Sequence, residues 1–157
     1  MKIAIGADHA GYTLKEKIKK FLSQNKIEYQ DFGCYSAEST DYPDWAIKIA
    51  EAVAKKEFDR GILICGTGIG MCIAANKVPG IRAASCYEVF TARLSREHND
   101  SNILALGARI TGEDLTKKIV EEWLKAKFKG NRHKIRVDKI REIEEKYFKR
   151  EKTGLKD

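Results

Sequence analysis

Long apolar runs are absent from this chain of 157 residues, and this absence excludes several classes of protein. No apolar stretch approaches the ~20 residues that a membrane-spanning helix needs. The apolar segment near the N-terminus holds only three residues before Gly6, too few for a secretory signal peptide. With 43% apolar residues, two prolines and no low-complexity tract, the chain is not expected to be disordered. We therefore expect a soluble, cytoplasmic protein.

Cysteine spacing is equally restrictive. The four cysteines form no Cys-x-x-Cys pair and have no zinc-like spacing with the three histidines. A disulfide framework is not expected in a cytoplasmic chain of this size, and neither is a structural zinc site. Each thiol must therefore be judged by its own surroundings.

The net charge of +7 is concentrated at one end of the chain. Residues 1–124 carry 17 basic and 17 acidic side chains, whereas residues 125–157 carry 13 basic and 6 acidic ones and hold the whole excess. This segment is either a solvated charged helix or part of an anion site for a small phosphorylated ligand or a polyanion. Nucleic-acid binding is disfavoured, because glutamates and the stripe Val137, Ile140, Ile143 and Tyr147 interrupt the basic residues.

Short apolar runs alternate with helical patterns along the chain. Continuous apolar runs predict strands buried on both faces, and one mixed run predicts an edge strand. The strands are expected at 3–5, 27–32 (the edge strand), 62–65, 83–86 and 103–106. Helices are expected at about 13–25, 43–56, 69–77, 87–98, 113–127 and 133–149. Thr13 and Glu16 have the spacing of a capping box, and Pro43 suits a first helical turn.

This alternation predicts one domain over residues 1–149 and a flexible tail over 150–157. The expected architecture is a Rossmann-like three-layer α/β/α sandwich around a five-stranded parallel sheet. In such sheets ligands bind outside the carboxyl ends of the strands. That rule selects Asp8 and His9, Cys65–Gly70, and Gly107–Arg109 as candidate site residues.

The segment GADHAG at residues 6–11 has the two-glycine spacing of a P-loop. Tyr12 and Thr13 occupy the positions of the phosphate-binding lysine and the hydroxyl residue of a P-loop, so a P-loop nucleoside triphosphatase is excluded. What remains is Asp8 and His9 at the exposed end of a strand. They either take part in chemistry, or Asp8 caps the following helix beside a surface histidine.

The segment CGTGIG at residues 65–70 is the most informative part of the chain. Its backbone amides lie at a helix N-terminus, where they can hold an oxyanion. A dinucleotide fingerprint has G-x-G-x-x-G after the first strand, so that cofactor is disfavoured here. Beside these amides Cys65 would be stabilised as a thiolate, able to act as nucleophile or base. The alternative is a small buried apolar residue.

Basic residues near the predicted helix ends complete the set of candidates. His98 and Asn99 end the fourth helix, where a histidine often only interacts with the helix dipole. Arg132 and Arg136 lie on one helical face, and together with Arg109 they would form a phosphate-binding site. All three arginines could equally be surface charges.

Together these segments resemble ribose-5-phosphate isomerase of the B type, a family that also contains galactose-6-phosphate and allose-6-phosphate isomerases. The motifs that carry the resemblance fall in order over about residues 1–149. They are GADHAG at 6–11, CGTGIG at 65–70, AANK at 74–77, REHN at 96–99, LGAR at 106–109, and Arg132 with Arg136. Some branches of the family lack the cysteine and place a glutamate just after the glycine turn. Here Cys65 is present and Met71 follows Gly70, which is the pattern of the cysteine branch.

The resemblance implies an aldose–ketose isomerase of ribose 5-phosphate and ribulose 5-phosphate that needs no metal or cofactor. It also implies a sheet order of 2-1-3-5-4 and a homodimer, or a tetramer, with shared active sites. Asp8, His9 and Cys65–Gly70 would come from one chain, and His98, Asn99 and Arg109 from the other.

The resemblance also assigns roles to single residues. Cys65 would move a proton between C1 and C2, and His98 would open the sugar ring. Thr67 and Asp8 would handle sugar hydroxyls. The remaining substrate-binding residues would be His9, Tyr42 (stacking on the sugar), Gly66, Gly68, Ile69, Gly70, Asn99, Arg109, Arg132 and Arg136, with the amides of Gly66–Gly70 holding the enediolate.

Other functions remain open from the sequence. A non-catalytic module for a phosphosugar or nucleotide would leave Cys65 unreactive, and a nucleic-acid-binding protein would show steep salt dependence. Among isomerases, the motifs do not decide between five-carbon and six-carbon sugars. Galactose-6-phosphate enzymes combine two different subunits, whereas this chain holds every motif, which favours ribose 5-phosphate.

Overall fold

The computed structural model describes the backbone of residues 1–151 and the side chains of residues 1–148. Five strands form the sheet: β1 (Lys2–Ala7), β2 (Glu28–Asp31), β3 (Arg60–Cys65), β4 (Ala83–Ser85) and β5 (Ile103–Gly107). The helices are α1 (Tyr12–Gln24), α2 (Tyr42–Ala54), α3 (Ile69–Ala75), α4 (Val89–Asn99), α5 (Glu113–Lys125) and α6 (Arg132–Glu151). Every strand and helix expected from the sequence is present.

The sheet is parallel throughout, with the order β2-β1-β3-β5-β4, so the order implied by the resemblance is confirmed. In the centre, Cys65 of β3 pairs with Gly107 of β5, and Gly61 pairs with Ile103. The carboxyl ends of these neighbouring strands therefore lie together, and their amino ends lie together at the opposite edge.

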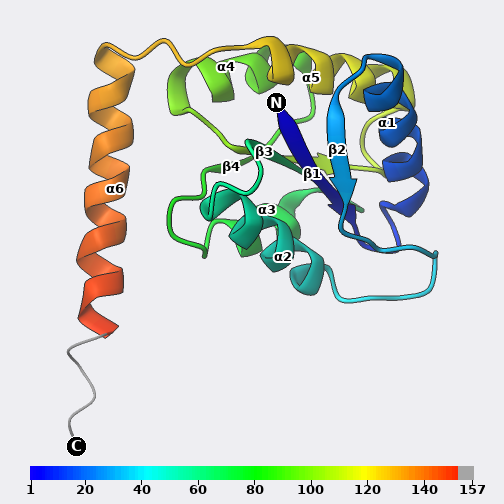
Figure 1. Ribbon diagram of the computed structural model, residues 1–157, viewed down its shortest axis with the longest axis horizontal. Coiled ribbons are helices and arrows are strands. Elements are labelled where there is room, and N and C mark those ends of the chain that lie inside the picture. Colours follow the sequence, from blue (N-terminus) through cyan, green and yellow to red (C-terminus); the bar gives the residue numbers. More distant parts are fainter. Residues whose placement is uncertain (152–157) are drawn as a thin grey trace, which may run out of the picture.

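Helices cover both faces of the sheet, which makes the three-layer sandwich (Figure 1). Neighbouring strand residues point to opposite faces. Ile3 and Ile5 pack with α1, α4 and α5 on one side, whereas Ala4 and Leu63 pack with α2 and α3 on the other. This arrangement explains why β1, β3 and β5 read as continuous apolar runs.

The first helix begins differently from the expectation. α1 begins at Tyr12 with Gly11 as its N-cap and no side-chain cap, so the predicted capping box of Thr13 and Glu16 is wrong. The carboxylate of Asp8 accepts the amide N–H of Gly11 at 3.0 Å and forms a turn before the helix. Thr13 therefore lies inside the first helical turn. In α2, by contrast, Pro43 does occupy the first turn.

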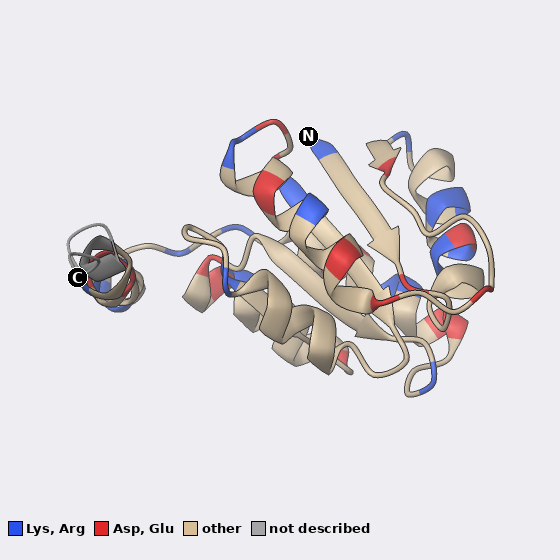
Figure 2. Cartoon of the chain, turned by 90° about the horizontal axis from the view of Figure 1, so that it is seen from below, with Lys and Arg blue, Asp and Glu red and all other residues tan. Residues whose placement is uncertain are grey.

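α6 stands beside the rest of the domain, beyond β4, and follows a segment over 126–131 that is neither helix nor strand (Figure 1). Viewed end-on, it carries basic and acidic residues all around (Figure 2). In the expected stripe only Val137 is buried, while Ile140, Ile143 and Tyr147 are 42%, 58% and 58% exposed. The tail expected over 150–157 overlaps the end of α6 at 150 and 151, and residues 152–157 lie outside the described part.

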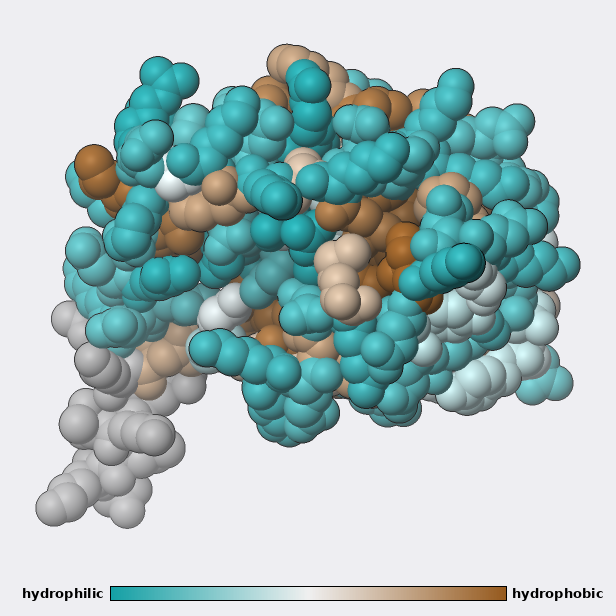
Figure 3. Space-filling view, turned by 45° about the horizontal axis from the view of Figure 1, so that its top comes forward, coloured by the Kyte–Doolittle hydropathy of each residue, from teal (hydrophilic) through white to brown (hydrophobic). Residues whose placement is uncertain are grey.

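The face of the molecule seen in Figure 3 is mainly hydrophilic, with apolar side chains exposed in several separate areas. No helix in the described part of the chain is long and apolar enough to cross a membrane.

Candidate functional site

Cys65 lies at the carboxyl end of β3, in the middle of the sheet, and is only 4% exposed. The amide N–H of Gly68 donates to its Sγ atom at 3.1 Å. The structure therefore places the sulfur of Cys65 against the backbone amides of the turn that follows it.

The turn that follows Cys65 depends on two of its glycines. Gly68 has φ +82°, a left-handed conformation that side chains disfavour, and it directs its N–H back toward the sulfur. A Cβ atom on Gly70 would lie 2.7 Å from Cζ of Tyr42, so only glycine lets that ring approach the turn. Thr67, Ile69 and Tyr42 are exposed around the turn, and the Ile69 N–H donates to Oγ1 of Thr67 at 3.3 Å.

The loop after β1 brings Asp8 and His9 to the same edge of the sheet. Asp8 is 6% exposed, and its N–H donates to the carbonyl of Ile64, the residue before Cys65. The carboxylate of Asp8 holds the turn before α1 through the N–H of Gly11, but Gly11 and not Asp8 is the N-cap of the helix. The backbone N–H of Thr40 donates to Nδ1 of His9 at 3.2 Å, which leaves Nε2 available to a ligand.

The buried side chain of Lys15 stabilises the surroundings of the loop after β1. Lys15 is fully buried, and its Nζ donates to both carboxylate oxygens of Asp31 at 2.8 Å and to the carbonyl of Cys34 at 2.6 Å. Burial acts to raise the pKa of Asp31, but hydrogen bonds from Lys15 and Lys19 outweigh it and hold that pKa below its ordinary value of 3.8. The N–H of Cys34 in turn donates to the carbonyl of Ala7, and the N–H of Ala7 donates to the carbonyl of Gly33, directly before Asp8.

Arg109 lies at this edge as well. A Cβ atom on Gly66 would lie 3.5 Å from Nη1 of Arg109, and the Arg109 N–H donates to the Gly66 carbonyl at 3.0 Å. The expectation that Arg109 serves the Cys65 turn of a second chain stays a prediction. Because β3 and β5 are neighbours, Arg109 already lies beside the turn of its own chain.

The other candidates lie at the opposite edge of the sheet. His98 and Asn99 end α4, and the turn that follows places the carbonyl of Asn102 against the N–H of Gly61 at 2.9 Å. At about 3.3 Å per residue, β3 separates this amino edge from Cys65 by roughly 17 Å. One chain therefore does not bring His98 and Cys65 together.

The imidazole of His98 is stacked on His133, with ring centroids 4.1 Å apart and ring planes at 6°. Burial, followed by the positive charges of His98, Arg132, Arg136 and Lys129, lowers the pKa of His133 below its ordinary 6.5. Neither Arg132 nor Arg136 has a hydrogen-bond or ion-pair partner among the described residues, and both are exposed. This end of α6 is therefore a positively charged surface, open to an anion.

The site thus consists of two separated groups. Asp8, His9, Tyr42, the Cys65–Gly70 turn and Arg109 form one group at the carboxyl edge. His98, Asn99, Arg132 and Arg136 form the other around the junction of α4 and α6. The predicted closeness of Arg109 to the arginine pair does not occur within one chain.

Comparison with known proteins identifies the family. A model of the Ribose/Galactose Isomerase family matches residues 3–140, which is most of the chain. The chain belongs to this family. Members with known names include ribose-5-phosphate isomerase B of Escherichia coli, which is 52% identical over 92% of this chain and 97% of its own length.

Two further family members show the range of the similarity. The solved structure of ribose-5-phosphate isomerase B from Clostridium thermocellum is 61% identical, with a TM-score of 0.93 over 94% of this chain and 99% of its own. The D-erythrulose-4-phosphate isomerase of Pectobacterium atrosepticum is 45% identical over 89% of this chain and 93% of its own. Family members at this level of identity therefore carry the names of more than one sugar phosphate.

Two residues of the site, Lys15 and His133, were not predicted from the sequence. Lys15 had a detectable signal, because it lies between Leu14 and Ile18 on the buried face of α1. His133 had none, since its stacking on His98 joins two helices whose packing is not visible in either segment.

Proposed function

We propose that this protein is an aldose–ketose isomerase that interconverts ribose 5-phosphate and ribulose 5-phosphate. The observation that carries the proposal is the Cys65 thiol, which accepts the Gly68 N–H at 3.1 Å within a turn of backbone amides. Proton transfer next to a carbonyl needs a base and a cradle for the resulting oxyanion. The Cys65–Gly70 turn supplies both in a member of this isomerase family.

In the open-chain aldose, the thiolate of Cys65 removes the proton from C2, and the C2 electron pair moves toward the C1 carbonyl. The negative charge then resides on O1 of an enediolate, and the amides of the Cys65–Gly70 turn stabilise it. Return of the proton to C1, with transfer of the O2 proton to O1, yields the ketose. No electrons leave the sugar, so the reaction needs no redox cofactor.

The remaining residues of both groups act before and around this step. His98 protonates the ring oxygen and opens the furanose, and Asn99 binds the opened sugar. Thr67 and Asp8 hold sugar hydroxyls near Cys65, while Tyr42 covers the sugar. His9, Arg109, Arg132 and Arg136 together grip the phosphate, because guanidinium groups match its oxygens with paired hydrogen bonds.

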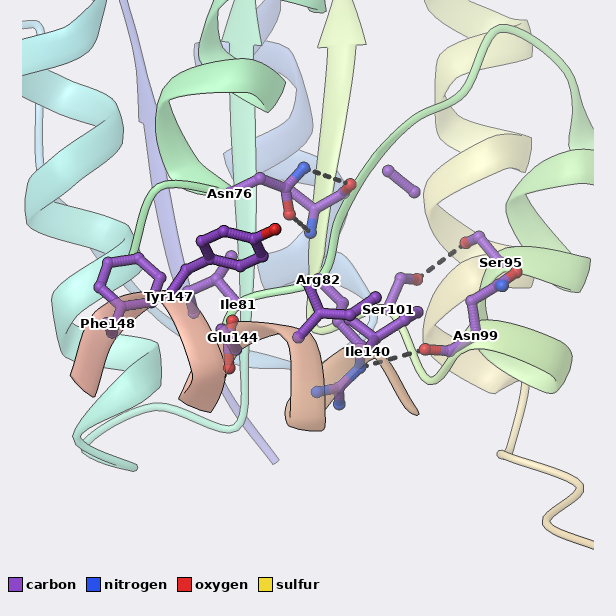
Figure 4. Close-up of a pocket in the computed structure, with 13 residues that line it drawn as sticks. Asn76, Ile81, Arg82, Ser95, Asn99, Ser101, Ile140, Glu144, Tyr147 and Phe148 are labelled. Atoms are coloured by element: carbon purple, nitrogen blue, oxygen red, sulfur yellow. Dashed lines mark hydrogen bonds between the residues drawn. The ribbon is translucent and has the colours of Figure 1, made fainter. Parts of the chain in front are cut away.

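These two groups act together only if two chains share each site, so we propose a homodimer. Supporting this, five large apolar side chains of α6 remain exposed in one chain, namely Ile135, Ile140, Ile143, Tyr147 and Phe148. Four of them, all except Ile135, line a hollow of about 520 Å³ between α6 and the loop before β4 (Figure 4). Exposed apolar surface of this kind marks a contact with a partner.

The substrate is tested by comparing kcat/KM for ribose 5-phosphate, allose 6-phosphate and galactose 6-phosphate under identical conditions. We expect the highest value for ribose 5-phosphate. A higher value for either six-carbon sugar would replace the proposed substrate while leaving the reaction type unchanged. No turnover of any of the three would contradict the isomerase itself. The cytoplasmic location expected from the sequence suits a substrate whose phosphate charge prevents passage through membranes.

A further inference from the structure

A second cavity, of about 440 Å³, opens at the amino edge of the sheet. It lies between the end of α2, the starts of β3 and β5, the segment before β4, and α6. The Cys65 turn is at the other edge, so this cavity is separate from the carboxyl-edge group of the proposed active site. Four arginines line it: Arg60, Arg82, Arg96 and Arg141.

Arg96 is the most deeply buried of these arginines, at 8% exposure. Its Nη1 donates to a carboxylate oxygen of Asp100 at 2.9 Å and to the carbonyl of Ser101. Its Nε, although fully buried, has no acceptor among the residues that the structure describes. A buried donor without an acceptor is costly, so the guanidinium of Arg96 is an incompletely satisfied charged group in the lining of this cavity.

Positive charge exceeds negative charge around this donor. Arg82 and Arg96 share the single carboxylate of Asp100, and Arg60 donates to main-chain carbonyls at the end of α5. Burial and the charge of Arg96 lower the pKa of Arg60 to about 10, against the opposing effect of Asp100 and Asp59. Asp59 is engaged at the chain terminus, where it accepts the N–H of Lys2 at 2.6 Å.

We propose that this cavity binds a phosphate-sized oxyanion, either free phosphate or the phosphate group of a small ester. Such an ion accepts hydrogen bonds from several guanidiniums at once and would offset the excess positive charge. The cavity volume lies within the range of small-molecule sites. The site adjoins the end of α4 but contains none of the residues assigned to catalysis, so it does not depend on the proposed function.

The test is calorimetric titration with inorganic phosphate, and separately with glycerol 3-phosphate, at constant ionic strength. Arg136→Ala provides the background, because it weakens the proposed phosphate grip of the active site. In that background we expect one saturable site per chain. Adding Arg60→Gln is expected to weaken it at least tenfold, as loss of a charge-assisted hydrogen bond does. The ligand that binds more tightly distinguishes free phosphate from an ester.

A second pair of variants avoids disturbing the hydrogen bonds of Arg60. Ala54 lines the cavity at the end of α2. Ala54→Glu would place a carboxylate in the cavity and repel the anion, whereas Ala54→Gln has nearly the same size without the charge. We expect much weaker binding for the glutamate variant than for the glutamine variant. Absence of saturable binding in the Arg136→Ala background, or equal binding by both Ala54 variants, would overturn the proposal.

Discussion

The thiol of Cys65 combines burial with one short contact, the Gly68 N–H at 3.1 Å. For the proposed base this contact fixes the position of the sulfur beside the amides of the turn. The neighbouring Cys72 differs. It is half-buried on α3 and its Sγ donates to the carbonyl of Ala83, and burial raises the pKa of this thiol.

We predict that Cys65→Ala lowers kcat by about 10²–10⁴, as loss of a positioned base does. The free energy of unfolding should change by less than about 2 kcal/mol, because only one sulfur atom is removed from the strand end. Steady-state kinetics and urea unfolding measure the two effects. Cys72→Ala is the matched control and should keep its activity. Near-normal turnover by Cys65→Ala would remove this residue from the mechanism.

His133 predicts a pH dependence of stability. Its pKa in the folded protein is below 6.5, so as the pH falls through 6.5 the unfolded chain takes up the proton first. Stability from this group is complete above 6.5 and is lost as the pH falls toward the lower, folded-state pKa. Urea unfolding at a series of pH values should therefore show a smaller decline for His133→Asn than for the wild type. Equal declines would contradict the assigned surroundings of His133.

At the scale of elements, the Cys65–Gly70 turn and α6 contribute different chemical groups to the proposed site. The turn provides oriented backbone amides, which cannot be deleted by a side-chain substitution. α6 provides exposed charge, with Arg132 and Arg136 one helical turn apart.

The turn leads to a prediction about metals. If backbone amides stabilise the enediolate as proposed, turnover survives exhaustive dialysis against EDTA without loss. Activity before and after dialysis, with and without added divalent ions, is the measurement. Loss on dialysis that one divalent ion restores would show that a Lewis acid holds the oxyanion instead.

The charge of α6 leads to a prediction about substrate affinity. Arg136→Ala should raise KM for the phosphorylated sugar about ten- to hundredfold, since a charge-assisted hydrogen bond contributes about 1.5–3 kcal/mol. Unfolding by urea should be nearly unchanged, because Arg136 is exposed. Lys139→Ala removes the same charge from an exposed position of α6 and is the control. If both Arg132→Ala and Arg136→Ala keep the wild-type KM, these arginines are surface charges.

The elements themselves were largely predictable from the sequence, and the reason is local. β1, β3 and β5 are buried on both faces, so their apolar runs identify them without knowledge of their partners. The start of α1 was not predictable, because it depends on the turn that the Asp8 carboxylate makes with Gly11.

Contacts between distant segments account for the remaining differences. The partner of Lys15 is Asp31, on a different element, so the pattern of α1 shows that position 15 faces inward but not what neutralises it. The position of Arg109 at the edge that holds the Cys65 turn was predictable, but motif order does not reveal that its side chain lies near Gly66. The Cys65 turn itself was found because cysteine and glycines are adjacent in sequence.

At the scale of the whole molecule, the fold separates Cys65, the proposed base, from His98, the proposed ring-opening residue. Cys65 is at the carboxyl edge of the sheet and His98 is at the amino edge. A two-fold dimer would form two complete sites, because each chain would contribute its carboxyl edge to one site and its α4–α6 junction to the other.

Complementation between two inactive variants tests this shared site most directly. Cys65→Ala and His98→Ala chains are mixed in equal amounts, unfolded together and refolded, and isomerase activity is compared with that of refolded wild type. Random pairing makes about half of the dimers mixed, and each mixed dimer has one site with both substitutions and one with neither. The account therefore predicts recovery of about a quarter of the wild-type activity. If mass measurement shows mixed dimers but the mixture stays inactive, His98 serves the Cys65 of its own chain and the shared site is contradicted.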